Sequence, residues 1–317
     1  MTAFLLRRLG HALLVLLVVS TVTFAIVHAA PGGPSLLADP KLSAAERAAI
    51  AERLGVDRPL AEQYGRWLAR LARGDLGNSF LYETTTLQTI RERLPNTIIL
   101  AGAALLVTIV VAIPVAAWSA EHPGGWVDRT AGALAMGAIS VPVFWLGIVC
   151  ILVFAVRLGV LPAGGATSAE GGATVSDRLR HLVLPAVVLA AAGTAELLRY
   201  TRASARQQFA RAFVRTARAK GVGERGVRWR HAMRNALIPA VTVIGLQLPR
   251  LVGGAAITET VFSWPGMGRL GIEAALARDY PLVMGITLVV SGGVLLASLL
   301  VDLAYLALDP RIRPDPT

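Results

Sequence analysis

The chain has 317 residues, of which 55% are hydrophobic and only 16% are charged, and its net charge is +11. Soluble domains carry about 25% charged residues, so this composition and the mean hydropathy of +0.60 point to the lipid bilayer. The single cysteine, Cys150, excludes a disulfide framework. The five histidines have no metal-ligand spacing, so no metal site is expected.

Six apolar segments reach or approach the length of about 20 residues that a spanning helix needs. They are Leu9–Ala30, Thr97–Ala117, Thr130–Val156, Leu182–Leu198, Ala236–Thr258 and Leu282–Val301. The fold class predicted from them is all-α, a polytopic membrane bundle of six transmembrane helices. Residues 1–30 form the N-terminal tail and first span, 31–96 a helical segment outside the membrane, and 97–317 the core with the other five spans.

The first apolar segment has an alternative interpretation. Arg7 and Arg8, the apolar run and the small residues Ala29 and Ala30 imitate a cleavable signal peptide. The hydrophobic region of a signal peptide is about 7–15 residues long, and this run is longer. A retained helix is therefore expected.

Orientation follows from the Lys and Arg residues near the ends of the spans. With both termini in the cytoplasm, sixteen of these residues fall in inner segments and five in short outer segments. Cytoplasmic N- and C-termini are therefore predicted.

The outer segment contains signals for two helices. "SAAE" at Ser43–Glu46 has the form of a capping box, and Gly55 stands where a C-terminal glycine would. A second helix is expected over Leu60–Arg73, ended by Gly74.

The aromatic face of this second helix includes Trp67, and a second outer aromatic, Trp264, lies in "FSWPGMGRL". These features favour a docking platform lying on the membrane, with Trp67 and Trp264 as candidate docking residues. A solvated helical loop is the alternative.

The loop of residues 200–235 lies in a strongly basic region. Eleven Arg and Lys stand between Arg199 and Arg234, with Glu224 as the single acidic residue among them. Helical spacing places Arg211, Arg215 and Arg218 on one stripe, and Phe209, Phe213 and Ala217 on the opposite stripe. Gly221 and Gly223 break this helix, and a further helix follows into the membrane.

Such an element is suited to pressing into another surface. It could also lie on anionic lipid, where each cation contributes about 1 kcal/mol. Nucleic-acid binding is not expected, because Trp229 is the only strong stacking residue near its second half and no recognised module is present.

Motifs for catalysis are missing from the sequence. It contains no GxxxxGK[ST], HExxH or GxSxG pattern. The prediction is therefore that the chain is not an enzyme and that it binds no cofactor itself. Gly266–Gly271 fits GxGxxG, but neither a strand nor a βαβ unit precedes it, and a nucleotide site is dismissed.

Ionisable residues within or beside the spans are costly in lipid, so they usually face a cavity or a partner. Arg250 and Glu259 are the candidates for a translocation path, and their spacing along a helix precludes a direct pair. Glu196 is expected to form a local ion pair with Arg199, and Asp302 to anchor a helix end.

From end to end the chain resembles the inner-membrane permease subunits of ABC importers, in the dipeptide/oligopeptide/nickel branch. The segments that carry the resemblance are "LLRRLG", "APGGP", "LGVDRPLAEQYGRWLARLARGDLGNSF", "RERLPNTIIL", "SVPVFWLGI", "HLVLPAVVLA", "RTARAKG", "RHAMRNALIP", "GGAAITETVFSWPGMGRL" and "DPRIR". The resemblance implies a second homologous permease subunit, two cytoplasmic ATPases that use ATP and Mg, and an extracytoplasmic binding protein that delivers the substrate.

The resemblance also implies a role for the basic loop. "RTARAKG" occupies the place of the loop whose short coupling helix sits in a groove of the ATPase. Arg215, Thr216 and Ala217 stand where the general motif has Glu-Ala-Ala, Gly221 matches its glycine, and Arg234 replaces its proline. The predicted coupling residues are Phe213, Arg215, Thr216, Ala217, Arg218, Ala219, Lys220 and Gly221.

The family resemblance leaves the cargo open. Peptide is the expected cargo, and nickel or a nickel chelate, glutathione and other small solutes are alternatives. A secondary transporter or channel that needs no ATP would show inverted repeats, which the sequence lacks. An intramembrane enzyme is disfavoured by the missing catalytic residues.

Overall fold

The computed structural model describes residues 2–29, 33–34, 37, 41–82, 84–168 and 174–308. Most of these residues are helical, and the described part of the chain contains no strand, only an isolated antiparallel bridge between Asn78 and Thr85. The all-α prediction is confirmed. Most of the "APGGP" turn and the C-terminal "DPRIR" lie outside the described residues.

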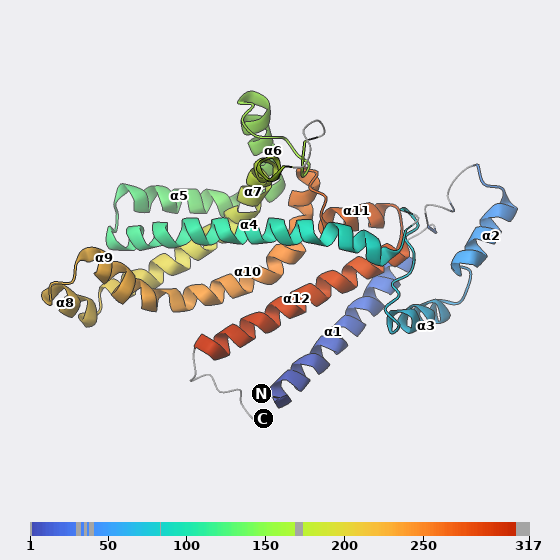
Figure 1. Cartoon of the computed structure of the whole chain (residues 1–317), viewed down its shortest axis with the longest axis horizontal. Coiled ribbons are helices and arrows are strands. Elements are labelled where there is room, and N and C mark those ends of the chain that lie inside the picture. Colours follow the sequence, from blue (N-terminus) through green and yellow to red (C-terminus); the bar gives the residue numbers. More distant parts are fainter. Residues whose placement is uncertain are drawn as a thin grey trace. The chain divides into compact units, whose positions relative to one another are not determined.

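Contacts divide the chain into two compact units. Unit one comprises Met1–Thr97 and Pro265–Leu296. Its elements are α1 (Thr2–Ala29), α2 (Ala44–Leu54), α3 (Leu60–Leu71), the first part of α4 (Thr86–Glu121), α11 (Met267–Leu276) and most of α12 (Tyr280–Leu308) (Figure 1).

The helices expected outside the first span are present as α2 and α3. The capping box is formed: Glu46 N donates to Ser43 Oγ at 3.2 Å, and Ser43 N donates to the Glu46 carboxylate at 2.8 Å. Gly55 ends α2 with a left-handed φ of 68°. Local sequence signals therefore set the bounds of α2, as predicted.

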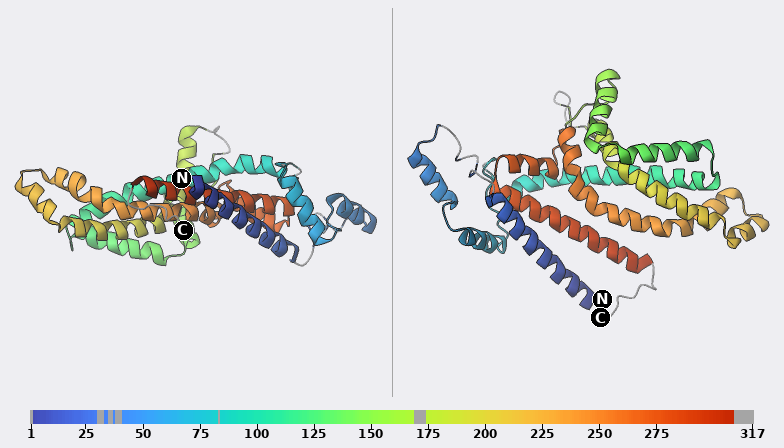
Figure 2. Two further views of the ribbon diagram at one scale, coloured as in Figure 1. Left: turned by 90° about the horizontal axis from the view of Figure 1, so that it is seen from below. Right: turned by 180° about the vertical axis from the view of Figure 1, so that it is seen from behind.

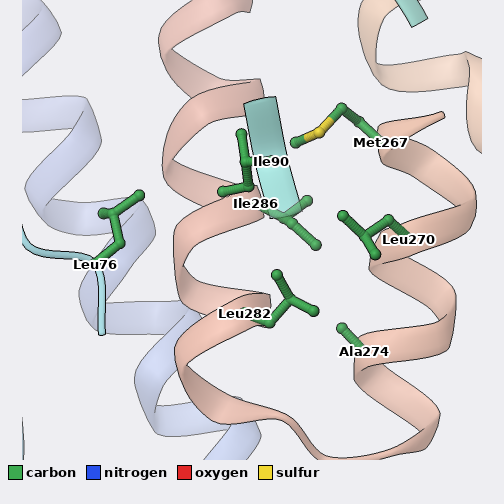
Figure 3. Packing of buried hydrophobic residues seen from close by; sticks show 7 residues of the cluster. All are labelled: Leu76, Ile90, Met267, Leu270, Ala274, Leu282 and Ile286. Atoms are coloured by element: carbon green, nitrogen blue, oxygen red, sulfur yellow. The ribbon is translucent and has the colours of Figure 1, made fainter. Parts of the chain in front are cut away.

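The core of unit one joins α11 and α12 to the start of α4 (Figure 3). Its buried members are Leu76, Ile90, Met267, Leu270, Ala274, Leu282 and Ile286. The buried Asp279 completes this packing, because its carboxylate accepts hydrogen bonds from Ser79 Oγ (2.5 Å) and from the backbone N–H of Leu282 (3.1 Å). Asp279 thus caps α12 and ties the loop before α4 to it.

Unit two comprises Ile98–Trp264 and Ala297–Arg313. It holds the rest of α4, α5 (Trp126–Ser140), α6 (Val143–Cys150), the π-helical η2 (Ile151–Arg157), α7 (Val175–Phe209), α8 (Ala212–Ala219), α9 (Glu224–Gly226), the π-helical η3 (Val227–Met233), α10 (Arg234–Val261) and the end of α12.

Helices α7 and α10 lie side by side in unit two (Figure 2). Small side chains in the cluster that these helices share with α4, among them Ala112 and Ala116 of α4 and Ala240 of α10, allow the helices to approach closely. At one close contact, Gln247 Nε2 of α10 donates to the backbone carbonyl of Gly193 on α7 at 3.0 Å. A Cβ on Gly193 would lie only 2.9 Å from the Gln247 side chain, so a larger residue there would separate the helices.

Among the described residues, four helices are long and apolar enough to span a membrane, and up to six spans result if each of two bent helix pairs counts as one. The third predicted span is not a single straight helix, because Trp126–Ser140 and Val143–Arg157 meet at 111°. The break falls at Val141 and Pro142, where proline disfavours helical geometry at the residue before it and Val141 is extended. The fifth span is bent by 56° between its two parts.

Candidate functional site

The basic loop folds into a short helix held against the helices that follow it. Helix α7 ends at Phe209, and the chain turns at Ala210 and Arg211 before α8 begins at Ala212. The two stripes predicted from the sequence placed Phe209 on the same helix as Ala217, and this prediction is wrong, because Phe209 ends α7. Figure 1 shows α8 and α9 together at one end of α7 and α10.

Two residues anchor α8. Val214 and Ala217 are buried against Val227 and Ala232 of η3, and Phe209 packs at the edge of this cluster. Their spacing of three places them on one face of the helix. Helix α8 is thus fixed to η3, which continues directly into α10.

The opposite face of α8 is exposed. Phe213, Arg215, Thr216, Arg218, Ala219 and Lys220 are all exposed. The predicted apolar stripe of Phe209, Phe213 and Ala217 is therefore wrong at Phe213, which keeps 38% of its surface accessible. The residue that takes its place in the core is Val214.

Gly221 ends α8 with a left-handed φ of 77°. Its N–H donates to Arg218 O at 2.9 Å, and the next N–H, of Val222, donates to Ala217 O at 3.2 Å. This is a Schellman arrangement, completed by the packing of Val222 in the cluster around Ala217. No heavy atom of the described residues lies within 4 Å of a Cβ built on Gly221, so the φ of this position requires the glycine, and close packing in the described chain does not.

Several arginines of the basic region are paired within the chain. Arg202 Nη1 and Arg206 Nη2 lie 2.8 and 2.7 Å from the carboxylate of Asp128 at the start of α5. Arg218 forms a two-bond ion pair with Glu224, which raises the pKa of its guanidinium.

Arg228 joins η3 to the end of α4. It pairs with Glu121 and lies over the Trp118 ring, with its guanidinium carbon 5.1 Å from the ring centre. Sequence reasoning missed this contact and the Asp128 cluster, because the partners are about 100 and 75 residues apart. The available signal was that Glu121 and Asp128 are the acidic residues flanking the turn between α4 and α5.

The remaining cations point outward. Six exposed residues between Arg211 and Arg234 form no ion pair with the described part of the chain: Arg211, Arg215, Lys220, Arg225, Arg230 and Arg234. This face therefore combines positive charge with the exposed ring of Phe213. It fits an acidic partner surface or anionic headgroups.

The second candidate region surrounds Arg250 on α10. Its Nη1 lies 3.3 Å from Glu196 Oε2 on α7, and 71% of the Arg250 side chain is exposed. The predicted local pair of Glu196 with Arg199 is therefore wrong, and Arg199 lies over the ring of Tyr200. An exposed ion pair on an apolar helix needs water or a polar partner beside it.

The other charged candidates, Glu259 and Asp302, are less exposed than Arg250. Glu259 has no exposed surface, and its backbone carbonyl accepts the N–H of Trp264 at 2.8 Å. Asp302 lies half-buried in the last part of α12. Glu259 is thus held in packed protein next to the end of α10.

Both tryptophans proposed for docking are also buried. Trp67 stacks on Tyr64, whose hydroxyl is 2.9 Å from Ser20 Oγ of α1, and this fixes α3 against α1. Trp264 packs with Leu100 and Ala186. Their rings leave little surface for a docked protein, so any docking contact would fall to exposed neighbours.

Among the described residues, no group of three or more His, Cys, Asp or Glu is placed to hold a metal ion. The arrangement instead offers a helix anchored on one face and presented on the other. Such an element can transmit movement between a partner and the helix that follows it.

Comparisons with known proteins identify the chain's relatives. Residues 112–314 match the family described as binding-protein-dependent transport system inner membrane component, and residues 1–101 match its N-terminal family. The oligopeptide transport system permease protein AppB of Bacillus subtilis is 37% identical over 99% of this chain and 100% of its own length.

Two other relatives are similar over the same extent. A putative peptide permease protein of Brucella suis is 39% identical, and the dipeptide transport system permease protein DppB of Escherichia coli is 36% identical, each over 99% of both chains. The family matches and these full-length similarities agree with the apolar helices and the anchored basic loop. The chain therefore belongs to the family of inner-membrane components of binding-protein-dependent transport systems.

Proposed function

We propose that this multi-pass plasma-membrane protein is one of two permease subunits of an ATP-driven peptide importer, and that it forms half of the translocation pathway. The observation that carries the proposal is the full-length similarity to relatives named as oligopeptide and dipeptide permeases. The chain itself is a non-catalytic subunit. ATP is bound and hydrolysed, with Mg, by two partner ATPases in the cytoplasm.

The exposed face of α8 is the proposed contact with one of these ATPases. It presents Phe213 and the cations Arg215 and Lys220, while Val214 and Ala217 hold the helix to η3. A rigid element with one anchored and one free face suits coupling, because movement of the partner is passed on to α10 instead of being lost in a flexible loop.

Two ion-pair clusters support this transmission. Arg228 links η3 to Glu121 at the end of α4, and Asp128 links the start of α5 to Arg202 and Arg206 of α7. A displacement of α8 is thereby shared among the ends of four long helices. The carboxylates of Asp128 and Glu121 are largely buried, so the loss of either partner would leave a charge unpaired in packed protein.

Arg250 is the proposed charged residue of the pathway. Its exposed guanidinium could neutralise the terminal carboxylate of a peptide, and Glu196 holds it in place without burying it. The six-span topology with both termini in the cytoplasm is part of the same proposal, and the distribution of Lys and Arg supports it. This topology places α2 and α3 outside, where the binding protein delivers the cargo.

Reconstitution tests the proposal. The chain, its partner permease and both ATPases are placed in liposomes with the binding protein, and uptake of radiolabelled dipeptides and longer peptides is measured with and without ATP. We expect uptake that requires both ATP and the binding protein. Uptake of nickel or glutathione in preference to peptide would change the cargo, and uptake driven by an ion gradient without ATP would overturn the importer.

A further inference from the structure

Unit one contains a cavity of about 480 Å³ that none of the proposed transport steps uses. It lies between the end of α1, the end of α2, α3 and the start of α12. Aromatic rings line one side: the ring centres of Phe24 and His28 are 3.9 Å apart, and those of His28 and Tyr280 are 4.6 Å apart. The cavity is thus walled partly by flat apolar surfaces.

Hydrogen-bond donors also line this cavity. Its lining includes five arginines and a single acidic residue, Glu52; the arginines are Arg53, Arg58, Arg66, Arg70 and Arg73. Arg58 and Arg66 share the carboxylate of Glu62. The other three form no ion pair with the described residues.

An unsatisfied donor is also buried in the cavity wall. Trp67 is 5% exposed and lines the cavity, and its Nε1–H has no acceptor among the described residues. A buried donor without a partner costs about 1–3 kcal/mol. The indole N–H has less than 1 Å² of accessible surface, so it is closed off from the cavity, and an anion there would be held by the free guanidinium groups.

The position of the cavity at the ends of two candidate spans indicates that the anion belongs to a lipid headgroup. Phe24 and His28 belong to the last turns of the candidate span Leu6–Ala29, and Tyr280 begins the candidate span Tyr280–Leu303. The ends of spans lie at the level of lipid headgroups, where aromatic residues gather. On the N-terminal side of Phe24, α1 exposes apolar side chains, among them Val18 and Val22, along which acyl chains can lie.

We propose that this cavity binds the phosphate-containing headgroup of an anionic phospholipid, with Arg53, Arg70 and Arg73 around the phosphate. Guanidinium groups pair with phosphate through two parallel hydrogen bonds, which suits a site with several arginines. The bound lipid would join α2 and α3 to the membrane-embedded end of α1. This goes beyond transport and assigns a structural ligand to the outer segment.

Native mass spectrometry of the assembled transporter tests the site. Retention of phosphatidylglycerol, relative to phosphatidylcholine, is measured for the wild type, for the double variant Arg53→Gln/Arg73→Gln, and for Trp67→Phe. Arg53 and Arg73 are exposed and partner-free in the described chain, so their removal leaves the packing intact. We expect the apparent affinity to fall about fivefold for each arginine removed. It should stay unchanged in Trp67→Phe, because the indole N–H that this variant loses is closed off from the cavity.

The matched control is Arg47→Gln, an exposed arginine of α2 that does not line the cavity. It should retain phosphatidylglycerol as the wild type does. Equal losses in Arg47→Gln and in the double variant would mean attraction by general charge and would overturn the site, as would unchanged retention in the double variant.

Two further experiments distinguish a lipid headgroup from free phosphate and from a docked protein. Titration calorimetry with inorganic phosphate should give no binding that depends on Arg53 and Arg73, and such binding would replace the lipid by a free phosphate. Binding of the extracytoplasmic binding protein to transporter in phosphatidylcholine nanodiscs should be unchanged in the double variant. A loss there, with normal lipid retention, would make the cavity a protein-docking surface and overturn the proposal.

Discussion

The carboxylate of Asp128 lies 2.7 Å from the guanidinium of Arg206, joining the first turn of α5 to the last turn of α7. Asp128 also accepts from Arg202 and from the backbone N–H of Gly124. An acid at a helix start and a base at a helix end both interact favourably with the helix dipoles.

Asp128→Asn tests this junction. The change removes the charge that holds two arginines, and because those arginines are partly exposed we expect a loss of about 1–3 kcal/mol, below the range for a fully buried pair. The melting temperature of the purified complex and its stimulated ATPase rate are the measurements, with the exposed Asp57→Asn as control. Wild-type stability and coupling in Asp128→Asn would show that the cluster has no mechanical role.

Gly221 provides a test of the end of α8. Alanine at a φ of 77° is strained by about 1–2 kcal/mol, so Gly221→Ala should weaken stimulation of ATP hydrolysis by loaded binding protein, and Gly221→Phe should abolish it and uptake. Gly223 is the matched control, because its φ is −60° and a Cβ there meets nothing within 4 Å. If Gly223→Ala and Gly221→Phe behaved alike, the coupling site would be misplaced.

The two faces of α8 should respond differently to truncation. Val214→Ala removes buried methyl groups and should lower stability by about 1–2 kcal/mol. Phe213→Ala removes an exposed ring, so it should leave the melting temperature unchanged and weaken the ATPase contact. Co-purification of the ATPase subunits and thermal unfolding measure the two effects, and a reversed pattern would mean that Phe213 is a packing residue.

Arg250→Leu should keep assembly but change transport. The Arg250 pair with Glu196 is exposed and contributes only about 0–1 kcal/mol to stability. If the guanidinium meets the peptide carboxylate, its loss raises KM for peptides with free C-termini and leaves C-terminally amidated peptides unaffected. Glu196→Gln is the companion variant, since it keeps the cation. Equal kinetics for both peptide classes would reduce Arg250 to a structural anchor.

Replacing either buried tryptophan, Trp67 or Trp264, should lower the stability of the fold more than it affects docking. Trp67→Ala and Trp264→Ala each remove a packed ring and should cost about 3–5 kcal/mol. Affinity for the binding protein, measured on the fraction that folds, separates packing from docking. Folded variants with full transport rates would end the idea of an aromatic docking platform.

Much of the local structure was determined by the sequence alone. The apolar runs located the long helices, Ser43 and Glu46 started α2, and the left-handed glycines Gly55 and Gly221 ended α2 and α8. These features depend on neighbours within a few residues of the chain, so they can be predicted from the sequence without knowledge of the tertiary structure. Pro142 carried a local signal for the break between α5 and α6 as well, although the apolar run concealed it.

Only the tertiary structure decided which charges meet and which faces are buried. Glu196 lies three residues from Arg199 yet pairs with Arg250, and Asp128 meets Arg202 and Arg206 across the bundle. Helical spacing alone allows either Phe213 or Val214 to face a core. Val214 is the buried residue, because η3 packs against its side of α8. Which charges pair and which faces are buried depends on how helices far apart in the chain pack together. The residues next to a side chain in the sequence do not indicate which distant helix it will contact.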